Sequence, residues 1–206
     1  CYLHQLQDFL WFTFDLLGLE PTQPGDVFNA TLTDMSVNMI YSHDLLPQII
    51  WGALIFLIGK LLFKSTKIGL AGLLMVVGHF VLDFFSGHPH HIFGEHTHSA
   101  GLGLYATHVY LAIGIEVLFT IVMLWLFFRS ETQSGIQRPT ANKAAIVGVF
   151  IFGISFLLFI ATTSLRQWFG LPDFDLGFNT TVPLLLSTYV GMTFYLNYLV
   201  GKHETV

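Results

Sequence analysis

The sequence contains little charge and almost no cysteine. Only 10 % of its 206 residues are Asp, Glu, Lys or Arg, whereas soluble domains carry roughly 25 %. Hydrophobic residues make up 53 % of the chain, and the mean hydropathy is +0.66. This composition is typical of an integral membrane protein. The one cysteine, Cys1, excludes a framework of internal disulfides.

The sequence also lacks the features of several large functional classes. Its formal net charge is −5, and no stripe of Lys and Arg could neutralise a series of phosphates. It has no serine nucleophile elbow, no Walker loop and no dinucleotide-binding glycine motif. We therefore expect no nucleic-acid partner, and neither covalent acyl transfer nor nucleotide chemistry has support.

Long apolar segments are what the chain has instead. We expect an all-α polytopic membrane bundle that forms a single domain over residues 1–206. Its five transmembrane helices are expected at about 45–63, 68–85, 105–128, 144–163 and 182–200. A shorter hydrophobic helix over 1–19 precedes an outer loop at 20–43. That helix is either the last part of a longer spanning helix or an interfacial one. Because the chain starts without an initiator Met, either an N-terminal segment is missing or a signal has been removed, and truncation is the simpler account.

Basic residues are distributed unevenly between the connections. The Lys60–Lys67 turn, the Arg129–Lys143 connector and Lys202 alternate along the chain with connections that contain few basic residues. Because Lys and Arg favour cytoplasmic loops, we expect the poorly basic connections to face the other side of the membrane. These connections are residues 20–43, 87–104 and 165–181.

The densest group of chemically active residues begins at His79. His79 and Asp83 are four residues apart in an apolar segment, so they lie on one helix face, about 6 Å apart along the axis. An imidazole and a carboxylate in this arrangement can share a divalent cation. Because ionisable groups inside a membrane are costly, we first interpret the pair as a functional site. The alternative is a hydrogen-bonded His–Asp pair that locks two helices together.

Other candidate ligands fall on the same expected side of the membrane. His43 precedes one helix there, Asp83 ends another, and His108 begins a third. Glu116 lies about three turns inside the predicted helix 105–128, either in the site or as a protonated acid in an interhelical hydrogen bond. For the remaining histidines of the following loop, a solvated His-rich loop is the favoured interpretation. These are His90, His91, His96 and His98.

Short motifs in a fixed order suggest a family. They are Y-S-H-D-L-L (41–46), G-H-F-V-L-D-F-F (78–85), H-P-H (88–90), G-L-G-L-Y (101–105) and G-I-E-V-L-F (114–119). The chain resembles, over nearly its whole length, small bacterial inner-membrane proteins described as membrane-bound metal-dependent hydrolases. It departs from their pattern at Gln7, where a Pro usually precedes the acidic residue at position 8. The spacing of His79, Asp83 and His88 is also similar to a pattern in zinc-dependent phospholipases C.

The resemblance implies a site with defined roles. The metal ligands would be His43, His79, Asp83 and His88, and the metal would be a divalent cation, most simply Zn²⁺. Glu116 and Asp8 would be the catalytic carboxylates, one of them acting as general base.

Three functions remain compatible with these residues. The first is a metal-dependent hydrolase that cleaves a lipid or a lipid-linked ester or phosphodiester at the outer membrane face. The second is a transporter of metal ions or protons, in which the His-rich loop collects ions. The third is a non-catalytic accessory subunit of a larger membrane complex, with bound haem as a minor variant. Membrane lipids are the expected partners in each case, together with a membrane protein in the third.

The charge distribution predicts the sidedness of the chain. We expect a cysteine at Thr97 to react with an impermeant thiol reagent from the non-cytoplasmic side, and a cysteine at Ser65 to be protected. The two variants are compared in intact cells with Cys1 replaced by Ser. Labelling of the Ser65 variant with protection of the Thr97 variant would reverse the predicted orientation.

Overall fold

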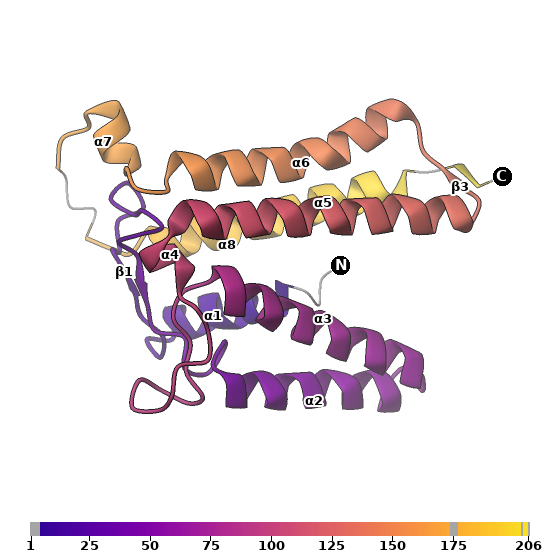
Figure 1. The fold of residues 1–206 in the computed structure, drawn as a ribbon, viewed down its shortest axis with the longest axis horizontal. Coiled ribbons are helices and arrows are strands. Elements are labelled where there is room, and N and C mark those ends of the chain that lie inside the picture. Colours follow the sequence, from indigo (N-terminus) through magenta and orange to yellow (C-terminus); the bar gives the residue numbers. More distant parts are fainter. Residues whose placement is uncertain (1–4, 174–176, 203, 206) are drawn as a thin grey trace.

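The protein is a bundle of helices whose axes run roughly side by side (Figure 1). It is described by a computed structural model that places residues 5–173, 177–202 and 204–205. The predicted all-α class is confirmed, whereas the first four residues of the predicted N-terminal helix lie outside the described residues. The helices are α1 (Leu6–Leu16), α2 (Leu45–Leu61), α3 (Thr66–Ser86), α4 (Leu104–Thr107), α5 (Val109–Gln133), α6 (Thr140–Phe159), α7 (Leu165–Phe169) and α8 (Thr181–Gly201).

Two very short antiparallel strand pairs fasten connections between helices. Strand β1 (Thr22–Gln23) pairs with β2 (Ser36–Val37), with Thr22 opposite Val37. Strand β3 (Ile136–Gln137) pairs with β4 (Glu204–Thr205). The first pair closes the long connection between α1 and α2, and the second ties the α5–α6 connector to the end of the chain.

Four of the described helices are long and apolar enough to cross a membrane. They are α3, α5, α6 and α8. Helix α2 is apolar but has 17 residues, a length of about 26 Å against a hydrocarbon thickness of about 30 Å. Of the five predicted transmembrane helices, the one at 45–63 is therefore not confirmed as a membrane span.

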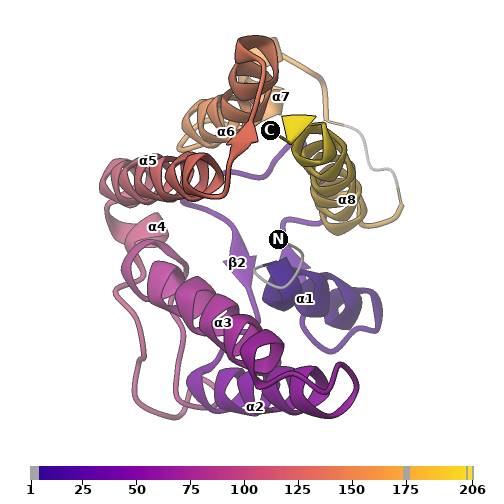
Figure 2. The ribbon, with the colours of Figure 1, turned by 90° about the vertical axis from the view of Figure 1, so that its right-hand side faces the viewer.

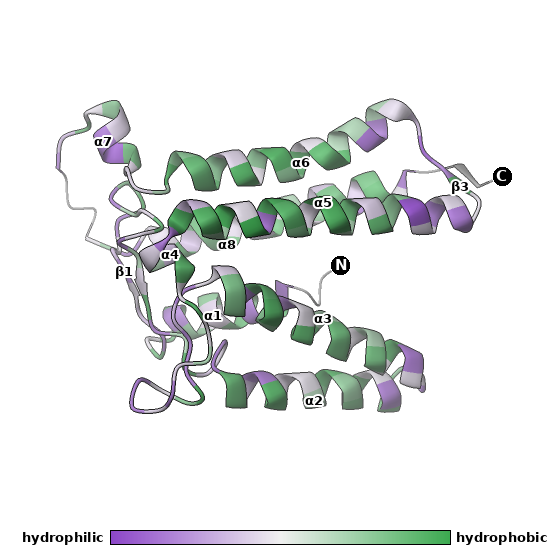
Figure 3. Ribbon diagram, viewed as in Figure 1, coloured by the Kyte–Doolittle hydropathy of each residue, from purple (hydrophilic) through white to green (hydrophobic). Residues whose placement is uncertain are grey.

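The helices consist mostly of apolar residues (Figure 3), and many of the large apolar side chains are exposed. Leu118 is 62 % exposed, Phe152 62 % and Phe194 67 %, although each lies within one of the long helices. Water would make such exposure costly, whereas lipid tails accept it. The surface therefore agrees with the composition in pointing to a membrane protein.

The long predicted helix over 105–128 is divided in the structure. Gly103, at a φ of 59°, starts the short α4, and His108 interrupts the helix with a φ of −144° and a ψ of 58°. Helix α5 then starts at Val109. The apolar pattern missed this break because the residues on both sides of it remain apolar.

The helices form two groups that meet along the middle of the bundle. Figure 2 shows them nearly end-on, with α1, α2 and α3 below α5, α6 and α8. Trp11 and Phe12 of α1 pack with Val182 of α8, which joins the groups on one side. The connections α1–α2, α3–α4 and α6–α8 gather at one end of the bundle, on the left in Figure 1. We call this the loop end.

Helices α2 and α3 approach each other through glycine. A Cβ atom built on Gly59 would lie 2.4 Å from the Cα atom of Gly69, and one on Gly69 would lie 2.6 Å from the carbonyl oxygen of Phe56. Neither position can accept a side chain unless the helices move apart. Small residues of this kind are common where membrane helices pack closely.

We expect Gly59→Ala to destabilise the α2–α3 pair by about 1–3 kcal/mol, because the methyl group overlaps backbone atoms that cannot rotate away. The measurement is thermal unfolding of the purified protein in detergent. Gly114→Ala in α5 is the control, since no described heavy atom lies within 4 Å of its Cβ position. Equal midpoints for the two variants would contradict the close contact.

Candidate metal centre

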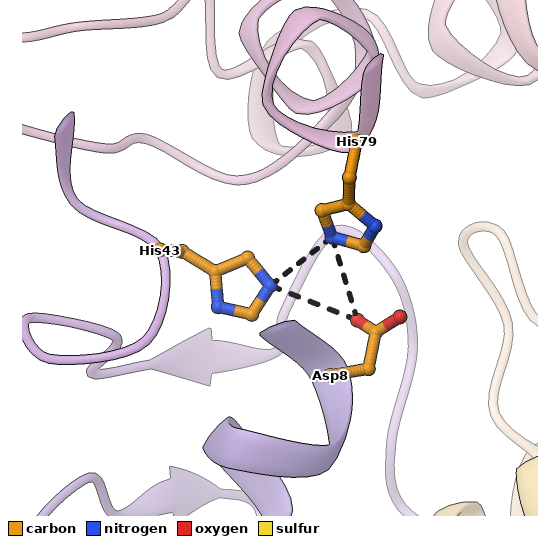
Figure 4. A group of neighbouring side chains, drawn as sticks. All are labelled: Asp8, His43 and His79. Carbon is orange, nitrogen blue, oxygen red and sulfur yellow. Dashed lines mark hydrogen bonds and ion pairs between the residues drawn. The ribbon is translucent and has the colours of Figure 1, made fainter. Parts of the chain in front are cut away.

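Three side chains from separate parts of the chain face one another inside the bundle. They are Asp8 of α1, His43 just before α2 and His79 of α3 (Figure 4). The Nε2 atoms of His43 and His79 are 3.4 Å apart. The Oδ1 atom of Asp8 lies 3.7 Å from Nε2 of His43 and 3.9 Å from Nε2 of His79. One potential ligand atom of each residue therefore points to a common centre.

Asp83 joins this group from α3. Its Oδ2 atom lies 3.1 Å from Nε2 of His79, one helical turn away, and 3.9 Å from Nε2 of His43. The four-residue spacing thus places imidazole and carboxylate together as predicted from the helix period. We call Asp8, His43, His79 and Asp83 the central cluster.

The spacing within the central cluster suits a small divalent cation. Bonds of about 2.0–2.2 Å in a tetrahedron place neighbouring ligand atoms roughly 3.3–3.6 Å apart. Among Asp8, His43 and His79 the measured separations are 3.4, 3.7 and 3.9 Å, close to this range, and Asp83 approaches the two histidine nitrogens at 3.1 and 3.9 Å. Within the described residues no Lys or Arg forms an ion pair with Asp8 or Asp83. Two carboxylates without a Lys or Arg partner would gain most from a bound cation.

The residues on both sides of His43 hold it in place. The hydroxyl of Ser42 lies 2.8 Å from Nδ1 of His43, on the ring side opposite the central cluster. The carboxylate of Asp44 accepts hydrogen bonds from the backbone N–H groups of His91 (2.8 Å) and Gly94 (2.5 Å). Asp44 thus fixes the α3–α4 loop and makes no side-chain cap on α2. The first N–H groups of α2 donate instead to the carbonyls of His91 and Ile92.

Two further histidines are buried beside the central cluster. His88, a predicted ligand, packs edge-on against Tyr105 with ring centroids 5.3 Å apart. His90 stacks on His43 with ring planes 11° apart. Burial lowers the pKa of His88 to about 4 and that of His90 to about 3, although the Asp83 carboxylate opposes both shifts. Both rings are neutral at pH 7, the form in which imidazole binds metals.

The remaining histidines of the loop divide into two kinds. His96 and His98 are exposed, as a solvated loop predicts, and so is His108 at the start of α5. For His90 the same prediction is wrong, because only 2 % of it is exposed. The carbonyl oxygen of His90 accepts from Ala100 at 2.7 Å, which folds the loop back over the site. No periodic pattern in the sequence distinguishes this histidine from its neighbours.

Glu116 lies in α5 and contacts Tyr105. The hydroxyl of Tyr105 donates a hydrogen bond to its Oε1 atom. Because α5 begins at Val109, Glu116 is about 10 Å, or two turns, from the helix start and not three. His79 lies at a similar distance from the end of α3 at Ser86. Both residues are therefore at a similar depth below the loop end.

Comparison with protein-family models, with curated proteins and with solved structures gives no match. The function must therefore be argued from the chemistry of the site itself.

We expect the purified protein to bind Zn²⁺, and His43→Ala and His79→Ala to weaken binding at least about 100-fold. Loss of a direct ligand should cost no less than loss of a supporting residue, which costs about 10- to 100-fold. Elemental analysis and chelator competition measure the binding. His96→Ala is the control, since its side chain is exposed in the loop. Equal zinc content in all four proteins would exclude the centre.

Proposed function

We propose that the protein is a metal-dependent hydrolase that cleaves a lipid or lipid-linked ester or phosphodiester at the non-cytoplasmic membrane surface. The observation that carries this proposal is the convergence of Asp8, His43 and His79 on one point, with Asp83 beside them, inside a bundle with an apolar exterior. The resemblance to bacterial inner-membrane hydrolases supports the reaction class and the location.

The central cluster supplies a suitable set of ligands. Two imidazole nitrogens and two carboxylate oxygens are typical donors for Zn²⁺. A divalent metal held there would supply Lewis acidity, which polarises a carbonyl or phosphoryl oxygen and makes water acidic enough to react at neutral pH. Asp8 has an oxygen 3.7 Å from His43, which favours a ligand role over its predicted role as general base.

Glu116 is then the candidate general base. Its carboxylate belongs to a different helix from the central cluster and forms no ion pair with His43 or His79. Tyr105 holds its Oε1 atom in place through the hydroxyl hydrogen bond. A carboxylate held beside a metal centre can accept the proton from the attacking water.

The position of the site suits an amphiphilic substrate. His79 and Glu116 lie about 10 Å inside the ends of α3 and α5, so the reacting bond would sit just below the membrane surface. The ester and phosphodiester bonds of a lipid lie at this interfacial level, whereas a soluble substrate would have to leave water. The shortage of Lys and Arg at the loop end supports an outward-facing site.

We expect Glu116→Gln to bind Zn²⁺ normally while losing hydrolysis by about 100-fold or more, because Gln keeps the shape but cannot accept a proton. The assays use bis(4-nitrophenyl) phosphate, 4-nitrophenyl butyrate and vesicles of phosphatidylethanolamine and phosphatidylglycerol. Product release is measured with and without a chelator.

Glu95→Gln is the control for this prediction, since Glu95 is an exposed carboxylate of the loop and far from α5 in sequence. Unchanged hydrolysis in Glu116→Gln would remove Glu116 from the mechanism. A wild-type protein that binds zinc but cleaves none of these substrates with any metal dependence would favour the accessory or transport functions.

A further inference from the structure

Gln7 is a polar residue of α1 whose side chain is fully buried, with an exposed fraction of 0 %. Its amide nitrogen Nε2 donates two hydrogen bonds to other helices. One goes to Oε1 of Gln48 in α2, at 2.9 Å, and the other to the backbone carbonyl oxygen of Val76 in α3, at 3.2 Å. An amide NH₂ group has two hydrogens, so both are used. One side chain thus links three helices.

The link to α3 lies next to two residues of the central cluster. Asp8 directly follows Gln7 in α1. Val76 and His79 are three residues apart in α3, so they lie on one face of that helix, and both are buried. The hydrogen bond from Gln7 to Val76 therefore holds the beginning of α1 against the face of α3 that carries His79.

Helix α1 needs such a directional contact more than its neighbours do. Helices α2 and α3 are already held to each other by the close approach of Gly59 and Gly69. Helix α1 has 11 residues and packs through Phe12 against Val182 of α8. Apolar packing of this kind determines the rotation of a helix only weakly, whereas hydrogen bonds require a defined direction. The two bonds of Gln7 therefore set α1 against the α2–α3 pair.

The amide pair is a costly way to fill this space. Oε1 of Gln7 and Nε2 of Gln48 are buried and have no hydrogen-bond partner among the described residues. A buried polar atom without a partner costs free energy, and two apolar side chains of the same shape would avoid that cost. Stability alone therefore does not account for the pair, whereas the direction that its hydrogen bonds impose on α1 does.

We infer that Gln7 is a positioning residue that, together with Gln48, sets the place of Asp8 in the central cluster. This inference rests on the proposed metal centre. Gln7 acts through the backbone of α1 and is not itself a ligand. Oδ1 of Asp8 lies 3.7 and 3.9 Å from the Nε2 atoms of His43 and His79. Because bonds to Zn²⁺ are only about 2.0–2.2 Å long, a small rotation of α1 would take this oxygen out of reach of a shared cation.

Zinc affinity in chelator competition tests the inference on the full chain, purified in detergent. We expect Gln7→Met to weaken zinc binding about 10-fold, because Met keeps the volume of Gln but cannot donate a hydrogen bond. Gln48→Met should weaken binding in the same direction. The double variant should unfold near the wild-type midpoint, since it leaves no unpaired amide, while its zinc binding stays weakened. Gln133→Met is the matched control from an exposed position in α5.

A second comparison distinguishes positioning from a general loosening of the bundle. In an Asp8→Ala background, we expect Gln7→Met to change zinc affinity by less than about two-fold, because the ligand that Gln7 positions has been removed. A merely structural role for Gln7 would weaken zinc binding by the same factor in both backgrounds.

The position of α1 is measured directly, in metal-free protein, by pulsed electron spin resonance. Spin labels on cysteines at Thr13 of α1 and Lys67 of α3, both exposed, report the distance between the helices when Cys1 is replaced by Ser. We expect one narrow distance distribution with Gln7 present and a broader or shifted one in Gln7→Met. The Gln133→Met control should give the narrow distribution.

The outcomes separate this inference from the proposed function. Three results overturn the positioning role alone: unchanged zinc affinity in Gln7→Met while His43→Ala loses zinc, an equal effect of Gln7→Met with and without Asp8, or an unchanged distance distribution. Absence of zinc binding in the wild type overturns the metal centre, and the spin-label distances still decide whether Gln7 fixes α1. If Gln7→Met does not fold, Gln48→Met decides the question by the same measurements.

Discussion

The placement of two partly buried carboxylates beside two buried imidazoles, within a bundle whose exterior is apolar, is the constraint on which the rest of the structure depends. Asp8, His43, His79 and Asp83 are held at 3.1–3.9 Å from their nearest partners. Charges in such surroundings cost several kcal/mol unless they are paired or bind a cation. Three separate chain segments meet at this point.

Polar contacts at the loop end hold those segments in register. Apolar helices pack without strong preference for one rotation or depth, so packing alone would not place ligand atoms accurately. The carboxylates of Glu20 and Asp44 accept hydrogen bonds from backbone N–H groups and so hold the chain on both sides of His43. Gly103 has a positive φ, and its backbone packs closely against Pro89. The buried carboxylates of Glu20 and Asp44 thus hold the loops in place through hydrogen bonds, whereas the helices set how far the site lies below the loop end.

The same arrangement separates ligands from the candidate base. His79 and Asp83 share α3, whereas Glu116 stands on α5 at a similar depth, held by Tyr105. Two rigid helices can keep a metal ligand and a proton acceptor at a fixed separation, and the histidine loop covers them from the loop end. Such a layout would suit the proposed hydrolysis, in which the reacting group would enter from the membrane interface while its apolar chains stayed in lipid.

The sequence by itself determined the features that depend on local periodicity. Apolar segments predicted the helices, and the four-residue spacing predicted that His79 and Asp83 share a face, because both follow from the pitch of an α-helix. Only the tertiary structure decided the break at His108, the burial of His90 and the contact of Glu20 with the residues before His43. These features depend on how loops fold against one another. Loop contacts have no period that a single sequence displays, and they are set by backbone hydrogen bonds between distant segments.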